Sequence, residues 1–152
     1  MVSISREDVF RSLLNELMAA ASMSGETVTL PGMVTETMSK TVWYEFQLLS
    51  MVPDKTRTDN FQARGTLRVI CNSRPGPTTA TTDISTPYAM TDQVRSAIER
   101  KDVRVMDYAS GAGLTLKGIA QIQEVQVDDL NDESNGVRPV MCTAEYLLSA
   151  EG

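Results

Sequence analysis

The stretch FQARGTLRVICN, residues 61–72, alternates apolar and polar side chains and decides the fold class. A period of two is typical of a β-strand with one buried face. The face that we expect to be buried consists of Phe61, Ala63, Leu67, Val69 and Cys71. Gly65 interrupts this series, and a glycine inside a strand indicates a bulge or a close approach of another chain segment. Arg64 and Arg68 share the opposite, polar side, and we expect them to face a subunit interface or a stacking partner, with simple solvent exposure as the alternative.

Further strands are expected before and after this stretch. Residues 41–51 and 137–149 show the same alternation. Short strands are expected at residues 28–30 and 103–109, and a long strand is expected at residues 114–128. The expected buried faces are Val42, Tyr44, Phe46 and Leu48 in residues 41–51, and Val140, Cys142, Ala144, Tyr146 and Leu148 in residues 137–149. Asn135-Gly136 is a turn signal, so the last two strands are expected to form a long antiparallel hairpin.

Two helices complete the pattern. Ser5 and Asp8 have the spacing of a capping box at the start of the first helix, and Ile4 and Val9 have that of a hydrophobic staple. The apolar stripe of this helix consists of Val9, Phe10, Leu13, Leu14, Leu17 and Ala21. A second helix is expected from Thr86-Pro87 to about Arg100, because proline is favoured at the first helical position. Its stripe is Met90, Val94, Ala97 and Ile98.

The order of these elements predicts the fold class. One helix, two or three strands, a second helix and three strands indicate an α+β domain, with two helices on one face of a mostly antiparallel sheet. The 152 residues are the usual size of one domain, and we expect residues 1–152 to form a single unit.

Charge argues against binding to nucleic acid, since the net charge is −6 and such domains are normally basic. The charge is also uneven: residues 55–104 hold nine basic and five acidic residues, whereas residues 110–152 hold two basic and seven acidic ones. Such segregation could place opposite poles on one subunit, or it could be an ordinary solvated distribution.

The usual catalytic constellations are absent from the sequence. There is no histidine, which excludes Ser-His-Asp and Cys-His arrangements and zinc sites with histidine ligands. Cys71 and Cys142 fall in apolar strands, where free cysteine acts as a small hydrophobe. The acidic residues 128–133 fail the EF-hand pattern, because Ser134 stands where glycine is required and Val140 stands where glutamate is required. We therefore expect no enzyme activity, no cofactor and no metal.

Targeting signals are not expected either. Arg11, Asn15 and Glu16 interrupt the apolar stretch near the N-terminus, unlike the core of a secretion signal. No run approaches the ~18 apolar residues of a membrane span. We expect a soluble protein made in the cytoplasm, without a membrane partner.

Several local pieces resemble the tail terminator, or tail completion, proteins of siphophages. An amphipathic helix at residues 5–21 leads to TVWYEFQLLSM at residues 41–51, and FQARGTLRVIC follows at residues 61–71. A loop rich in Pro, Gly and Thr precedes the helix TPYAMTDQVRSAIER at residues 86–100, and closing strands follow. The glycine-containing strand, the loop and the second helix carry most of the resemblance, which extends over most of the chain.

The resemblance implies a structural protein of the virion tail or neck, assembled in the host cytoplasm. Such a protein forms a ring, expected to be a hexamer, that caps the tail tube protein, ends tube polymerisation and joins the head-tail connector or stopper. The family has no active site. DNA passes through the lumen without specific binding, and an acidic lining would repel its phosphates. The candidate lining is Glu124, Asp128, Asp129, Asp132 and Glu133.

Two other interpretations of the function are compatible with the sequence. The first is another virion component, either a head-completion or stopper protein or a tail tube subunit, although two substantial helices are unusual in a tube subunit. The second is a small enzyme that uses paired carboxylates. Asp128 and Asp129 are adjacent, however, so they would face opposite sides of a strand.

Overall fold

The computed structural model describes residues 4–19, 27–29, 42–53, 62–73, 85–108, 115–129 and 138–150 of the chain. These residues form two helices, α1 (Arg6–Ala19) and α2 (Ser85–Ile98). They also form six strands: β1 (Thr27–Thr29), β2 (Val42–Pro53), β3 (Gln62–Ser73), β4 (Asp102–Met106), β5 (Leu116–Asp129) and β6 (Arg138–Ala150). The predicted elements are confirmed, and their ends differ by only a few residues.

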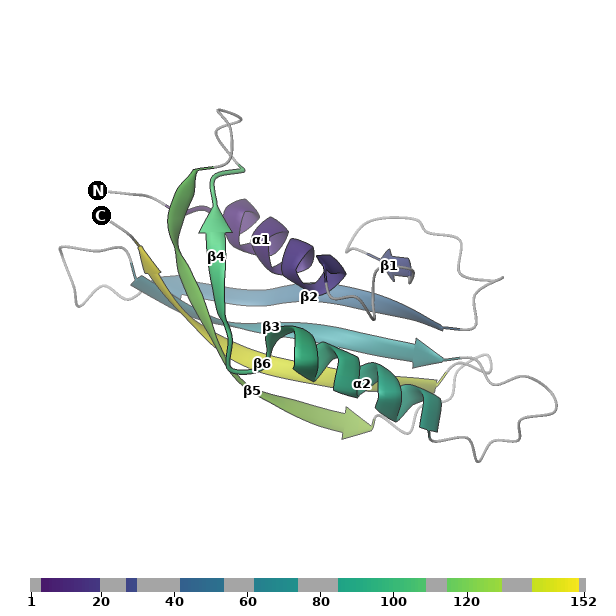
Figure 1. Ribbon diagram of the computed structural model, residues 1–152. Helices are drawn as coiled ribbons and strands as arrows, with labels where there is room; N and C mark the ends of the chain where they lie inside the picture. Colours follow the sequence, from purple (N-terminus) through teal and green to yellow (C-terminus); the bar gives the residue numbers. More distant parts are fainter. Residues whose placement is uncertain are drawn as a thin grey trace.

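The six strands form one sheet in the order β1-β2-β3-β6-β5-β4. Only β1 runs parallel to its neighbour, and every other pairing is antiparallel. Both helices lie on one face of the sheet, which curls around them (Figure 1). The α+β class is thus confirmed, and so is the long C-terminal pair of strands, β5 and β6. The predicted turn at Asn135-Gly136 lies outside the described residues.

The core lies between the two helices and one face of the sheet, here called the helix face. Its members are the alternating positions that the sequence predicted, including Tyr44, Phe46, Leu67, Val69, Cys142 and Tyr146, together with Val9, Leu13 and Leu17 of α1 and Met90, Val94 and Ile98 of α2. Phe10 packs on Phe46 with ring centroids 5.0 Å apart. Burial of this apolar area is the main favourable contribution to folding. Cys71 and Cys142 are free and buried, as expected.

Two bulges lie on one line across the sheet. In β2 the pairing with β3 shifts between Leu48 and Ser50, and in β5 the pairing with β6 shifts between Ile122 and Val125. The two strands between the bulges are joined on this line by Gly65 of β3, which pairs with Tyr146 of β6. Because a bulge bends its strand and increases the local twist, two aligned bulges account for the curl of the sheet.

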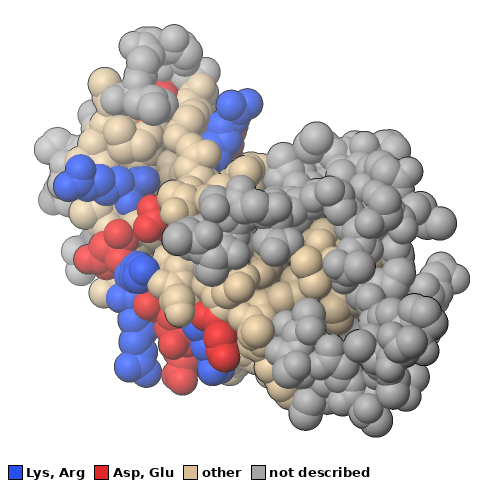
Figure 2. All heavy atoms as spheres, turned by 45° about the vertical axis from the view of Figure 1, so that its right-hand side comes forward, with Lys and Arg blue, Asp and Glu red and all other residues tan. Residues whose placement is uncertain are grey.

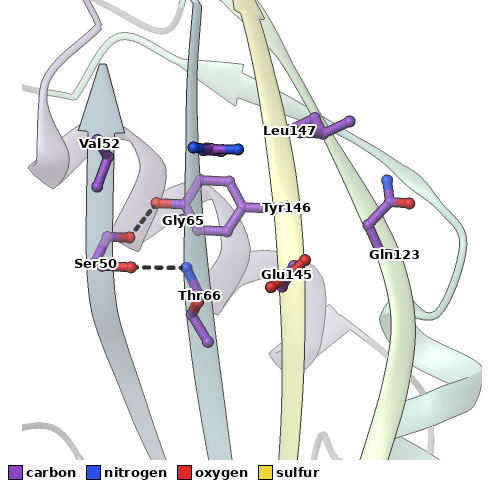
Figure 3. A pocket seen from close by; sticks show the side chains of 9 residues that line it. Ser50, Val52, Gly65, Thr66, Gln123, Glu145, Tyr146 and Leu147 are labelled. Atoms are coloured by element: carbon purple, nitrogen blue, oxygen red, sulfur yellow. Dashed lines mark hydrogen bonds between the residues drawn. The ribbon is translucent and has the colours of Figure 1, made fainter. Parts of the chain in front are cut away.

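Gly65 confirms the close approach that its position predicted. The Tyr146 ring crosses Gly65, and its hydroxyl donates a hydrogen bond of 2.7 Å to the Ser50 carbonyl at the β2 bulge (Figure 3). A Cβ on residue 65 would lie 2.0 Å from the Ser50 carbonyl oxygen and 2.4 Å from the Tyr146 hydroxyl. Only glycine therefore fits here. The bulge itself lies in the neighbouring strand β2.

The β5 bulge is held by the end of α2. The carboxylate of Glu99 accepts a hydrogen bond of 2.9 Å from the backbone N–H of Val125, and Arg95 donates one of 3.2 Å to the Val125 carbonyl. A bulge leaves ladder groups unpaired, and buried groups of this kind need partners. These two side chains supply the partners.

Helix α1 begins with the predicted capping box. The Asp8 backbone N–H donates to Ser5 Oγ at 3.1 Å, and the Ser5 N–H donates to Asp8 Oδ2 at 3.0 Å. Asp8 is fully buried and also accepts hydrogen bonds from the Tyr108 N–H at 2.8 Å and from Lys117 Nζ at 2.9 Å. One carboxylate thus takes part in the capping box of α1 and fastens the helix to Tyr108 and Lys117, about 100 residues further along the chain.

Candidate assembly surface

The second face of the sheet carries neither of the two described helices and is here called the open face. On β3 its side chains are the polar positions that the sequence predicted. Arg64 is exposed and Arg68 is half-buried, and both lie on this side, because the residues that alternate with them belong to the core. Neither arginine forms an ion pair with a residue that the structure describes. The prediction that they share one side is confirmed, while their role at an interface remains a prediction.

Three polar atoms of the open face are buried without a hydrogen-bond partner. They are Arg68 Nε, Asn72 Nδ2 and Thr143 Oγ1, and no other described side chain has such an atom. Arg68 and Thr143 are directly paired across β3 and β6. Asn72 is only 5% exposed and pairs with Trp43, which is buried as well. Leaving a buried donor or acceptor unbonded costs about 1–3 kcal/mol, so natural proteins rarely do so.

Two adjoining hollows lie on the open face along the line of the bulges. One has a volume of about 320 Å³ and the other of about 330 Å³, and both are bordered by Thr66, Gln123 and Glu145. Figure 3 shows the first, with Val52 and Leu147 at one end and Thr66 and Glu145 at the other. Val52 and Leu147 are 54% and 49% exposed. The surface thus combines an apolar rim with polar groups.

The acidic candidates do not lie on one face. Asp128 is exposed on the open face of β5, where it pairs with Met141, and Glu124 is exposed and borders the second hollow of that face. Asp129 is half-buried and pairs with Val140, which places it on the helix face. Asp132 and Glu133 lie outside the described residues. The structure therefore brings Glu124 and Asp128 onto the same face as Arg64 and Arg68, with β6 between the acidic and the basic strand.

Charges on the surface are intermixed, and this includes Glu124 of the open face. In Figure 2, basic and acidic side chains lie among one another in one area of the visible face. Exposed ion pairs join Arg11 to Glu7 at 3.2 Å and Arg100 to Glu124 at 3.9 Å. Pairs of this kind contribute about 0–1 kcal/mol to stability.

Ionisable side chains do not gather into a metal-ligand cluster anywhere in the described part of the chain. The pKa of the Cys71 thiol is raised, first by its hydrogen bond with Cys142 and then by burial, which makes it a poor nucleophile. The pKa of Lys117 is also raised, mainly because its ammonium donates to Asp8. None of the described helices is both long and apolar enough to cross a membrane. The Cys71 thiol and the Lys117 ammonium thus stabilise the fold. The open face is the strongest candidate for a functional surface.

Sequence reasoning missed Asn72 and Thr143. Both stand at polar positions of alternating strands, where solvent exposure is the ordinary expectation. Their burial depends on which strands become neighbours, since β3 and β6 are far apart in the sequence. The alternation itself was the only available signal, and it identifies the face but not the burial.

Comparisons place the fold among known structures. The chain is similar over 93% of its length to 94% of a chain from the virion of a native gene transfer agent particle, with a TM-score of 0.58 and 13% sequence identity. A second solved structure, whose description states no function, matches 99% of this chain over 98% of its own, with a TM-score of 0.61 and 8% identity. No protein family model and no curated protein matches. At such low identity the likeness establishes a shared fold, one that occurs in a phage-like virion particle.

Proposed function

We propose that this protein is a structural component of a phage-like virion, and that it is the ring-forming terminator of a tail. The observation that carries the proposal is the full-length similarity of its fold to a chain of a virion particle. The resemblance in sequence to siphophage tail terminators supports the more specific assignment as the tail terminator. In this role copies of the chain form a ring, expected to be a hexamer, between the tail tube protein and the head-tail connector or stopper.

The open face supports a role in assembly. Its exposed apolar residues Val52 and Leu147, and its two arginines, which form no ion pair with a described residue, are features of a surface that another protein can cover. In a closed ring each subunit contacts two neighbours through two different surfaces. We assign the β3 and β6 part of the open face, with Arg64 and Arg68, to one of these contacts.

An acidic lining of the lumen is a separate part of the proposal. Glu124 and Asp128 are exposed on β5, beside the part assigned to the contact, and can face a central channel while β3 faces a neighbour. Carboxylates there would repel DNA phosphates and let DNA pass without specific binding. A ring imaged at side-chain resolution with Glu124 and Asp128 on its outer wall would exclude this lining.

Charge reversal on the open face tests the assembly role. Imaging of the purified protein, alone and with tail tubes, should show discrete rings for the wild type, whereas Arg64→Glu combined with Arg68→Glu should abolish them. The matched control is Arg11→Glu combined with Lys101→Glu, which changes the net charge equally at exposed positions away from the open face. Rings that survive reversal at Arg64 and Arg68 would remove the open face from the contact.

Other outcomes of the same experiment separate the alternatives. Long tubes would favour a tail tube subunit over a terminator, and binding only to the head-tail connector would favour a stopper or head-completion protein. A stable monomer that never joins a particle would overturn the proposal as a whole.

A further inference from the structure

The outer edge of β4 is covered by α1 along only half of its length. The Met106 N–H donates to Ser12 Oγ at 3.0 Å, and the Tyr108 N–H donates to Asp8 Oδ1 at 2.8 Å. In these two bonds α1 takes the place of a neighbouring strand. Since four helix residues rise about 6 Å and two strand residues about 6.6 Å, the two elements stay in step over one turn.

The next turn of α1 leaves the edge of β4 uncovered. The carbonyl of Lys101 and the N–H of Asp107 both bond to the β5 side, to Ile122 and Thr115 respectively, so the odd-numbered residues of β4 face β5. Asp102 and Arg104 therefore direct their N–H and C=O groups away from β5. No described side chain of α1 bonds to them as Asp8 and Ser12 bond to Tyr108 and Met106.

A groove lies at this uncovered edge. It has a volume of about 440 Å³, and its lining residues are Ser12, Asn15, Glu16, Ala19, Asp102, Arg104, Met106 and Tyr108. A row of alternating backbone donors and acceptors beside a groove is a template for one further strand. The helix α1 forms the other wall and limits the occupant to an extended segment. The same sheet already holds a three-residue strand, β1, at its opposite edge.

We propose that this groove receives an extended segment of a neighbouring copy of the chain, which adds a strand to β4 at Asp102 and Arg104. The inference rests on the proposed function, because it assigns one of the ring contacts. A strand of about three residues buries far less than the ~1,000 Å² that a stable interface needs. It therefore suits a neighbour that is already held nearby, whose effective concentration is high, better than a free peptide.

Glu16 adds a preference for the sequence of that segment. Its exposed carboxylate lines the groove and forms no ion pair with a described residue. Side chains of an added strand alternate between the two faces of the sheet, and those on the helix side meet the wall formed by α1. A basic side chain at that position of the segment is favoured.

Proline at position 104 tests the backbone role of the edge. Arg104→Pro removes one outward N–H and blocks the approach of a strand, while the bonds from β4 to β5 remain, since proline is tolerated on an edge. Arg104→Ala is the matched control because it removes the same side chain but keeps the N–H. We expect Arg104→Pro to raise the protein concentration needed for ring formation on the order of tenfold, with Arg104→Ala close to wild type in light scattering and negative-stain images.

Filling the groove gives a second, independent test. Ala19 lines the groove and Met18, which is 45% exposed, does not. Ala19→Tyr should weaken assembly as Arg104→Pro does, whereas Met18→Tyr should not, and circular dichroism and melting temperature confirm that each variant is folded. If Arg104→Pro and Ala19→Tyr form rings like the wild type, strand addition at β4 is wrong and the proposed function stands. If the wild type forms no ring under any condition, both proposals are wrong.

Discussion

On the helix face of the sheet, the polar groups that lie among apolar side chains are bonded from several directions, whereas on the open face three comparable atoms have no partner. Asp8 accepts from the backbone of Ser5 and Tyr108 and from the Lys117 ammonium. Tyr146 donates across β3 to the β2 bulge. Arg68 Nε, Asn72 Nδ2 and Thr143 Oγ1 on the open face have no such bond. Among the described side chains, the buried polar atoms of the helix face are thus bonded within the chain, whereas these three atoms of the open face are not.

Under the proposed function, the difference separates residues that serve folding from residues that serve assembly. A substitution on the helix face should change the free energy of unfolding of the monomer. A substitution on the open face should leave that free energy almost unchanged and alter the association of subunits.

Asp8→Ala should cause the largest loss in the free energy of unfolding. It removes the carboxylate that accepts the Ser5 N–H in the capping box, together with two tertiary hydrogen bonds, and it leaves the Lys117 ammonium, whose side chain is 18% exposed, without its closest partner. Breaking a buried pair from one side costs about 3–5 kcal/mol, and partial hydration of Lys117 should place the loss near 3 kcal/mol. Urea unfolding followed by circular dichroism measures it. The control, Glu7→Ala in the same turn, is exposed and should change stability by less than about 0.5 kcal/mol.

Gly65→Ala should follow, with a loss of about 2–3 kcal/mol, because overpacking forces backbone and side chains apart. The added Cβ would meet the Ser50 carbonyl and the Tyr146 ring. Tyr146→Phe alone should cost only about 1 kcal/mol, the contribution of one hydrogen bond. It should not rescue Gly65→Ala, because the Ser50 carbonyl is the nearest atom at 2.0 Å. Full rescue in the double variant would contradict the backbone clash.

The strands show how much of this contrast could be predicted from the sequence. Alternation at residues 61–71 and 137–149 identified the buried face of β3 and β6, and the glycine at position 65 signalled a close approach. The pairing of β3 with β6 could not be predicted, since its paired residues, from Ser73 with Arg138 to Gln62 with Ser149, are 65 to 87 positions apart and nothing local specifies the partner. Without knowledge of that pairing, the burial of Thr143 beside Arg68 could not be predicted. The further bonds of Asp8 were missed for the same reason, because the capping box is local and its partners Tyr108 and Lys117 are not.

Alkaline pH should lower the free energy of unfolding through Lys117 on the helix face, by less than the two substitutions above. The pKa of Lys117 is raised in the folded state, first by its hydrogen bond to Asp8. A raised pKa means that the folded state holds the proton more tightly, so this contribution is complete below the unfolded pKa of 10.5 and is lost as the pH rises through the folded pKa. Stability measured in a Tyr146→Phe background, which removes a second group whose pKa is raised to about 12 by burial, should fall with pH. Adding Lys117→Met should make that decline shallower, and an unchanged slope would show that the Lys117 bond to Asp8 does not form.

Thr143→Val should change the free energy of unfolding of the monomer least. Unlike the substitutions above, it should not lower that free energy. Valine keeps the shape of threonine and removes the hydroxyl that is buried without a partner, so the free energy of unfolding should stay constant or rise by up to about 1 kcal/mol. Thr66→Val is the control on the same face, since its hydroxyl is not among the unbonded atoms. If a neighbouring subunit bonds the Thr143 hydroxyl, the same substitution should weaken ring formation several-fold while the monomer becomes no less stable. A loss of about 1 kcal/mol or more in the monomer would instead show that the hydroxyl is bonded within the chain, and the contrast between the two faces would then rest on Arg68 and Asn72 alone.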